Sequence, residues 1–97
     1  MAVKIIKFSA GWCAPCKMMQ PIFTKISTME EFKNIEFKSY DIENDEKGIE
    51  LVNTFNIKNI PTIVILDNDD IVLKKIIGAI NEKELIEIIK DSIKYAI

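Results

Sequence analysis

The stretch SAGWCAPCKMMQP, residues 9–21, carries two cysteines with only two residues between them, after an apolar segment and before a helical pattern. Cys13 and Cys16 are the only cysteines of the 97-residue chain, which contains no histidine. A close pair of this kind binds a metal, crosslinks the fold or exchanges electrons with other thiols. The segments on either side help to decide which of these chemistries the pair can perform.

These flanking residues predict a strand followed by a helix. Closely spaced apolar side chains indicate a buried strand at Ala2–Phe8. From Ala14 onward apolar residues recur at helical spacing, and Pro21 inside that pattern is expected to kink the helix. We expect this helix to end near Phe32 or Asn34.

The next segment predicts a second strand and a short helix. Apolar and polar residues alternate over Ile35–Ile42, which indicates a strand. Asn44 or Asp45 can cap the helix that follows, in spite of the helix penalty of Gly48. The apolar face expected for this helix consists of Ile49, Val52 and Phe55, with Leu51 on its flank.

The last third of the chain predicts a hairpin and a final helix. Thr62–Leu66 and Ile71–Ile77 are apolar strands joined by a run of four polar residues, and Gly78 ends the second strand. Asn81 and Glu84, three positions apart, resemble a capping box. The buried stripe expected for the final helix consists of Leu85, Ile89 and Ile93, broadened by Ile86, Ile88 and Ile97.

Together these segments give the order βαβαββα in a single domain over residues 1–97. Parallel strands joined by a right-handed crossover and followed by a hairpin predict an α/β fold. We expect one four-stranded mixed sheet with helices on both faces.

Composition narrows the range of partners and compartments. Hydrophobic residues make up 48% and charged residues 29% of the chain, which is ordinary for a globular domain. A net charge of −2, with lysines spread along the chain, argues against nucleic-acid binding. The start of the chain has no long apolar segment typical of a signal peptide or membrane span. We therefore expect a cytoplasmic protein, taken as a monomer, that does not bind membranes.

The position of Cys13 predicts its chemistry. It lies where the helix is expected to begin, and the unpaired amides and dipole of a helix N-terminus favour an anion such as a thiolate. Cys16 lies one turn later, close enough to form a disulfide with Cys13. Pro15 is tolerated in the first turn and stiffens the ring. In the expected reaction Cys13 attacks a disulfide of a partner, and Cys16 then displaces the reduced partner.

The competing interpretations of the pair are weaker. Structural zinc usually needs four cysteine or histidine ligands, and one copy of this chain offers two. A dimer bridged by a shared metal or iron–sulfur cluster stays open as an alternative. A crosslink over so few residues would remove little loop entropy, so stability explains it poorly. We expect no metal and no cofactor beyond the redox-active disulfide of Cys13 and Cys16.

Several motifs resemble one known family. WCAPCK, from Trp12 to Lys17, is similar to the thioredoxin active-site motif, whose usual form has glycine at the position of Ala14. Pro21 matches the family's helix-kinking proline, Ile60-Pro61-Thr62 its cis-proline loop, and Gly78 a glycine after the last strand. The family's usual strand and helix before the active-site strand are missing. The chain therefore resembles a minimal thioredoxin or a glutaredoxin-sized relative.

The resemblance implies a site for substrates beside the cysteines. Pro61, if cis, would lie against the pair, and the Ile60 backbone would bind an extended substrate as an added strand. Trp12, Gly78 and Ala79 would complete a shallow apolar groove. Simpler interpretations are a trans-proline entry turn, a packing role for Trp12 and a plain strand break at Gly78.

Four residues are candidates for tuning the cysteines: Ala14, Pro15, Lys17 and Lys7. Lys17 could steady the thiolate by charge, although an exposed helix lysine is the commoner state. Lys7 stands where the family usually has a buried acidic residue that helps to move the proton of the second cysteine. A neutral Lys7 could accept that proton, and a charged one would favour the Cys16 thiolate. Alternatively its stem packs in the strand while the ammonium reaches solvent or a carboxylate.

The favoured function is reduction of protein disulfides, with electrons from a thioredoxin reductase or another thiol. The first alternative is a glutaredoxin-like oxidoreductase coupled to glutathione. The second is a binding module of the same fold whose cysteines are incidental. The two cysteines alone do not fix whether such a protein oxidises or reduces its partners, because potentials of CxxC proteins span roughly 150 mV.

Overall fold

The computed structural model describes residues 3–95. Its elements in chain order are β1 (Lys4–Ser9), α1 (Ala14–Ser27), a 3₁₀ turn (Glu30–Phe32), β2 (Glu36–Asp41), α2 (Glu46–Thr54), β3 (Thr62–Leu66), β4 (Val72–Ile77) and α3 (Glu82–Tyr95). The predicted order βαβαββα is confirmed. The first strand begins at Lys4 and extends to Ser9, one residue beyond its predicted end, and the predicted start at Ala2 lies outside the described residues.

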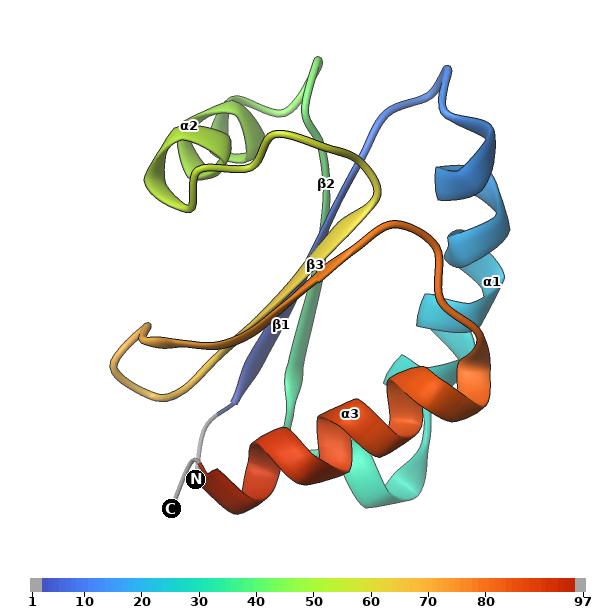
Figure 1. The fold of residues 1–97 in the computed structure, drawn as a ribbon, viewed down its shortest axis with the longest axis vertical. Helices are drawn as coiled ribbons and strands as arrows, with labels where there is room; N and C mark the ends of the chain where they lie inside the picture. The colour runs from blue at the N-terminus through green and yellow to red at the C-terminus, as the bar shows by residue number, and fades with distance from the viewer. Residues whose placement is uncertain (1–2, 96–97) are drawn as a thin grey trace.

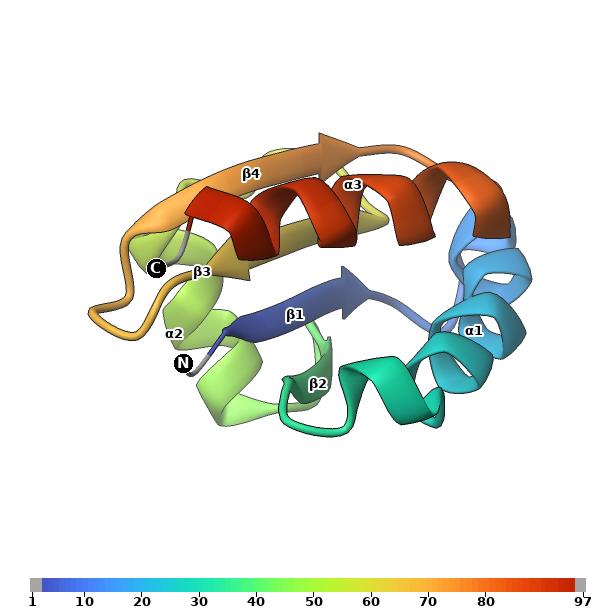
Figure 2. The same cartoon turned by 90° about the horizontal axis from the view of Figure 1, so that it is seen from below.

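The four strands form one mixed sheet in the order β2-β1-β3-β4. β1 is parallel to β2 and antiparallel to β3, and β3 and β4 form an antiparallel hairpin. Figure 1 shows α2 on one face of the sheet and α1 and α3 on the other, and Figure 2 shows the strands side by side. The predicted α/β fold, a four-stranded mixed sheet with helices on both faces, is confirmed.

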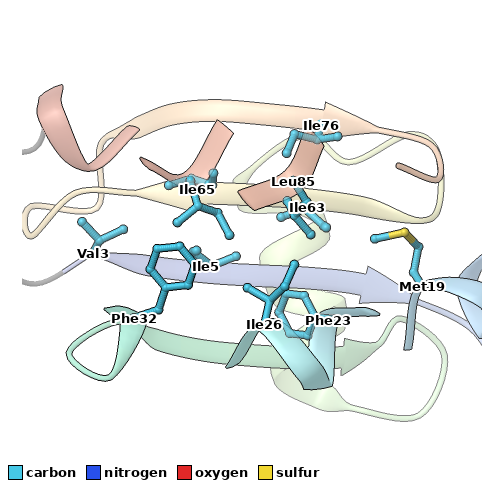
Figure 3. Packing of buried hydrophobic residues seen from close by; sticks show 11 residues of the cluster. Val3, Ile5, Met19, Phe23, Ile26, Phe32, Ile63, Ile65, Ile76 and Leu85 are labelled. Atoms are coloured by element: carbon cyan, nitrogen blue, oxygen red, sulfur yellow. The ribbon is translucent and has the colours of Figure 1, made fainter. Parts of the chain in front are cut away.

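The larger core lies between the sheet and helices α1 and α3. Phe23 and Ile26 of α1 point toward Ile5 and Ile63 of the sheet, and all four are at most 4% exposed (Figure 3). The Phe23 ring also packs edge-on against Phe37 of β2, with ring centroids 5.5 Å apart. Burying each such side chain stabilises the fold by about 1.5–3 kcal/mol. This packing holds α1, the helix that carries Cys16, against β1.

The first helix ends earlier than predicted. It stops at Ser27, and Met29 has an extended backbone with φ −69° and ψ 134°, which breaks the helical path before the 3₁₀ turn. Thr28 closes the last turn by donating both its backbone N–H and its hydroxyl to the carbonyl of Lys25. The local hydrogen bonds of Thr28 therefore end the helix, although the apolar pattern in the sequence continues past this residue. Pro21 lies inside α1, as expected.

The second helix differs in its cap and in its buried face. Asp45 occupies the N-cap position, but its side chain accepts a hydrogen bond from the Asp41 backbone N–H at 2.8 Å instead of capping the helix. Ile49 is 45% exposed, so its predicted place in the buried face is wrong. In the structure Leu51, predicted on the flank of the helix, packs against the sheet in the place expected for Ile49. The side chains that contact the sheet cluster Ile6, Phe8, Val64 and Leu66 are Leu51, Val52 and Phe55.

The hairpin and the final helix follow the predicted pattern closely. β4 begins at Val72, one residue later than expected, because Asp70 has a positive φ of 62° and the Ile71 N–H donates to Asp67 Oδ1. Gly78 has φ +92°, which ends the strand. At the start of α3 the Glu84 N–H donates to Asn81 Oδ1 at 2.8 Å. Leu85 and Ile89 are buried, Ile86, Ile88 and Ile93 are partly buried, and Ile97 lies outside the described residues.

Candidate active site

The site lies at the end of the sheet where three loops meet. Cys13 follows β1, Pro61 precedes β3, and Gly78 follows β4, so the sheet topology brings all three loops to one end (Figure 1). The Gly78 N–H donates to the carbonyl of Pro61 at 2.9 Å, which ties two of these loops together. The Ile60-Pro61 peptide bond is cis.

The cysteine pair has the geometry expected for a disulfide at a helix N-terminus. Cys13 is the N-cap residue of α1, and its Sγ accepts a hydrogen bond from the Cys16 N–H at 3.2 Å. The two Cα atoms are 5.2 Å apart, and the two residues are joined by a disulfide. Cys13 is 5% and Cys16 3% exposed, so both residues are buried.

This geometry favours Cys13 as the nucleophile once the disulfide is reduced. A thiolate at Cys13 would keep the N–H of Cys16 as a donor and would lie at the positive end of the α1 dipole, which lowers the pKa of a thiol. Ala14 and Pro15 are exposed in the first turn, where proline costs no helical hydrogen bond. Lys17 is also exposed, as the simpler interpretation of that residue predicts.

The surroundings of the pair are apolar. Ala10 forms a small buried cluster with the two cysteines, and Ile42 and Ile60 pack against it. The predicted substrate residue Ile60 is thus brought directly to the cysteines, and Pro61 is buried beside it. Trp12 has an exposed fraction of 67%. Gly78 is half-buried and Ala79 exposed.

Sequence reasoning missed Ile77 as a candidate site residue. Ile77 is opposite Thr62 in the hairpin, directly beside the Pro61 loop, and its exposed fraction is 62%. Ile77 lines an open pocket with residues 56–59 and Thr62, so its apolar side chain extends the exposed surface around the Pro61 loop. The signal was present in the sequence as an isoleucine just before Gly78, but alternation alone did not show which face of β4 is open.

Lys7 lies inside the protein. Its exposed fraction is 0%, its Nζ donates to Oε1 of Gln20, and it lies 5.4 Å from the centre of the Phe23 ring. The interpretation in which the ammonium reaches solvent or a carboxylate is wrong, because the side chain points between β1 and α1, where Gln20 is its partner. Burial lowers the pKa of Lys7, since desolvation disfavours its charged form.

Metal binding and membrane spanning can also be checked against the structure. Within residues 3–95, no three acidic, cysteine or histidine side chains are grouped as a metal site would require. The helices in this part of the chain are also too short or too polar to cross a membrane.

The sequence and the fold are similar to known thioredoxins. A family model described as Thioredoxin matches residues 2–91. Thioredoxin Asp f 29 of Aspergillus fumigatus is 37% identical over 75 residues, which are 77% of this chain and 64% of that protein. A thioredoxin of Borreliella burgdorferi is 34% identical over 87 residues, 90% of this chain and 70% of that protein. The crystal structure of a Malassezia sympodialis thioredoxin, Mala s 13, matches with a TM-score of 0.80 and 29% identity, covering 93% of this chain and 74% of that chain.

These likenesses agree with the site geometry. The chain spans slightly less than two thirds of the Aspergillus protein and a larger share of the other two. The relatives and the Cys13–Cys16 pair together support thiol–disulfide oxidoreductase activity. Because the family match runs through nearly the whole chain and includes both cysteines, the chain belongs to the thioredoxin family.

Proposed function

We propose that this protein reduces disulfides of other proteins by thiol–disulfide exchange. The observation that carries the proposal is the placement of Cys13 at the N-cap of α1, with Cys16 one turn later in bonding distance. In the reduced protein the Cys13 thiolate attacks a substrate disulfide and forms a mixed disulfide. Cys16 then attacks Cys13 Sγ, releases the substrate as a thiol and leaves the intramolecular disulfide.

The proposed electron donor is a thioredoxin reductase or another thiol, and the proposed compartment is the cytoplasm. The family match supports a thiol-based donor. A reducing compartment keeps the dithiol form available for attack on substrates. We also propose that the protein acts as a monomer, with Ala14, Pro15, Lys17 and Lys7 tuning the cysteines.

The proposed substrate groove consists of Trp12, Ile60, Pro61, Gly78 and Ala79, to which we add Ile77. The side chains of Trp12, just before the first cysteine, and of Ile77, at the end of β4, are both exposed. An extended substrate segment would place its backbone along Ile60 and its apolar side chains on this surface.

The direct test couples the purified protein to two donor systems. We expect it to speed the reduction of a protein disulfide when NADPH and a thioredoxin reductase are the donors, and much less with glutathione and glutathione reductase. The reduction potential should lie near that of reductants of this type, about −270 mV, and far from oxidants near about −120 mV. Faster turnover with glutathione would favour the glutaredoxin-like alternative. No acceleration with either donor would leave the binding module as the better explanation.

Trp12→Ala is expected to lower kcat/KM for a protein disulfide by roughly tenfold, because about 1.4 kcal/mol of apolar contact with the substrate is lost. Reduction of a small aromatic disulfide should change little, since such a compound does not reach along the groove. Steady-state kinetics with both substrates measures the difference. Tyr95→Ala removes another exposed aromatic ring, on α3, and serves as the control. Equal losses with both substrates would show that Trp12 acts on the cysteines instead.

A further inference from the structure

A methionine of the first helix holds the loop that follows β4. Met19 lies on α1 one turn after Cys16, and its exposed fraction is 1%. Its Sδ accepts a hydrogen bond from the backbone N–H of Ile80 at 3.3 Å. Figure 3 shows Met19 at the end of the core where β1 and β4 end. The contact joins residues 61 positions apart and fixes the loop between β4 and α3 against the helix that carries Cys16.

The same loop is tied to the loop that precedes β3. Gly78 donates its backbone N–H to the carbonyl of Pro61 at 2.9 Å. Two residues later Ile80 donates to Met19, so the hydrogen bonds connect α1 through residues 78–80 to Pro61. Ala79, between the two donors, is exposed. One acceptor on α1 thus reaches both loops of the proposed substrate groove.

A second polar contact between α1 and the chain after β4 is weaker. Lys25 Nζ pairs with Glu82 Oε1 at 3.0 Å, but their side chains are 66% and 37% exposed. Ion pairs in contact with water contribute little to stability. This pair also lies at the start of α3, beyond residues 78–80. It therefore does not replace the Met19 contact in holding the loop.

The sulfur of Met19 provides an acceptor that a hydrocarbon side chain lacks. Ile80 is half-buried, so its N–H needs either an acceptor or a path to water. A thioether is a weak acceptor, and methionine is flexible enough to bring it to a backbone donor inside a core. Leucine would fill nearly the same volume but would leave this N–H without a partner. The loop would then shift toward water to solvate the N–H.

We infer that Met19 is a positioning residue for substrate binding, because it sets the place of residues 78–80 relative to the cysteines. The inference rests on the proposed function, since Gly78 and Ala79 belong to the proposed groove. Met19 is part of the larger core, whereas the cysteines form a separate small cluster with Ala10. Loss of its sulfur should therefore weaken the binding of an extended substrate and leave the exchange between sulfurs unchanged.

Met19→Leu tests the inference by steady-state kinetics with a protein disulfide and an excess of the electron donor. We expect KM to rise about fivefold while kcat stays within about twofold, because a weak hydrogen bond that positions the groove contributes equally to the bound substrate and the transition state. The reaction with 5,5′-dithiobis(2-nitrobenzoate), a small disulfide that makes little use of the groove, should keep its rate. Amide hydrogen exchange, followed by NMR, should become faster at the Ile80 N–H and change less at the Gly78 N–H.

Two control variants separate positioning from packing. Met29→Leu makes the same replacement at a methionine that packs against the same core, and should leave KM and the exchange of Ile80 unchanged. Ile26→Val removes a methyl group from that core and should lower the stability of the fold without raising KM.

Three results would overturn the inference. They are an unchanged KM or an unchanged exchange of the Ile80 N–H in Met19→Leu, an equal loss of rate with the small disulfide, and a comparable rise of KM in Ile26→Val. A wild type that reduces no protein disulfide would instead contradict the proposed function, and the inference with it.

Discussion

Cys16→Ser protein is expected to accumulate as a covalent adduct with its substrate. Cys13 remains at the N-cap of α1, so the first exchange proceeds, but no sulfur is left one turn away to release the partner. Resolution must then wait for an external thiol. Because intramolecular attack is favoured by very high effective concentrations, multiple turnover should fall by roughly 1,000-fold or more. Non-reducing electrophoresis and the mass of the adduct detect the trapped species.

The matched variant is Cys13→Ser, which should form no adduct and show no turnover. Cys16 is 3% exposed, and its sulfur follows the first turn of α1 instead of capping it. Its thiol therefore lacks the helix-terminus stabilisation that Cys13 has. Equal adduct formation by the two single variants would contradict the assignment of Cys13 as the nucleophile. Dithiothreitol should dissolve the Cys16→Ser adduct, because its bond is a disulfide.

The cysteine site could be predicted from sequence because its determinants are local. The order of residues from Trp12 to Lys17 sets both the helix start and the spacing of the sulfurs. The elements around it were predictable for the same reason, since periodicity reports which side chains a strand or helix buries. The errors fall where long-range packing decides, as with Ile49, which lies on the apparent apolar face of α2 yet is 45% exposed.

Surroundings built from distant segments were harder to foresee. Gln20 carries no recognisable motif, and only the docking of α1 on β1 places its amide at Lys7. Ile77 belongs to an ordinary apolar strand until the hairpin register sets it beside the Pro61 loop. Ile42 likewise reaches the cysteine cluster from the end of β2. Propensity and spacing contain no information about such contacts, because they depend on how whole elements pack together.

Lys7→Met is expected to stabilise the folded protein by about 1–3 kcal/mol at pH 7, because it replaces a desolvated amine with an apolar side chain of similar length. The amide of Gln20 loses its donor but lies at the surface, where water replaces it. The contact with the Phe23 ring is kept by the methionine sulfur. Urea unfolding of the two proteins at one pH gives the difference in the free energy of unfolding.

The pH dependence of that difference identifies its cause. The pKa of Lys7 in the folded protein lies below its ordinary value of 10.5, so between these two values the unfolded chain binds more protons than the folded one. The stability of the wild type therefore rises with pH in this window, and the advantage of Lys7→Met shrinks toward pH 10.5.

Lys4, on the same strand, has the opposite effect on how the stability of the fold depends on pH. The hydrogen bond from its Nζ to Asp70 raises the pKa of Lys4, so the stability it contributes is present at neutral pH and is lost as pH rises through the raised value. Lys4→Met should therefore destabilise the fold less at high pH than at neutral pH. Lys7→Met should stabilise the fold at neutral pH and do so less at high pH. Parallel urea titrations at several pH values between 7 and 11 compare the two variants. An advantage of Lys7→Met that stayed constant over this range would mean that Lys7 acts through packing alone, because only a titrating amine links the stability of the fold to the proton concentration.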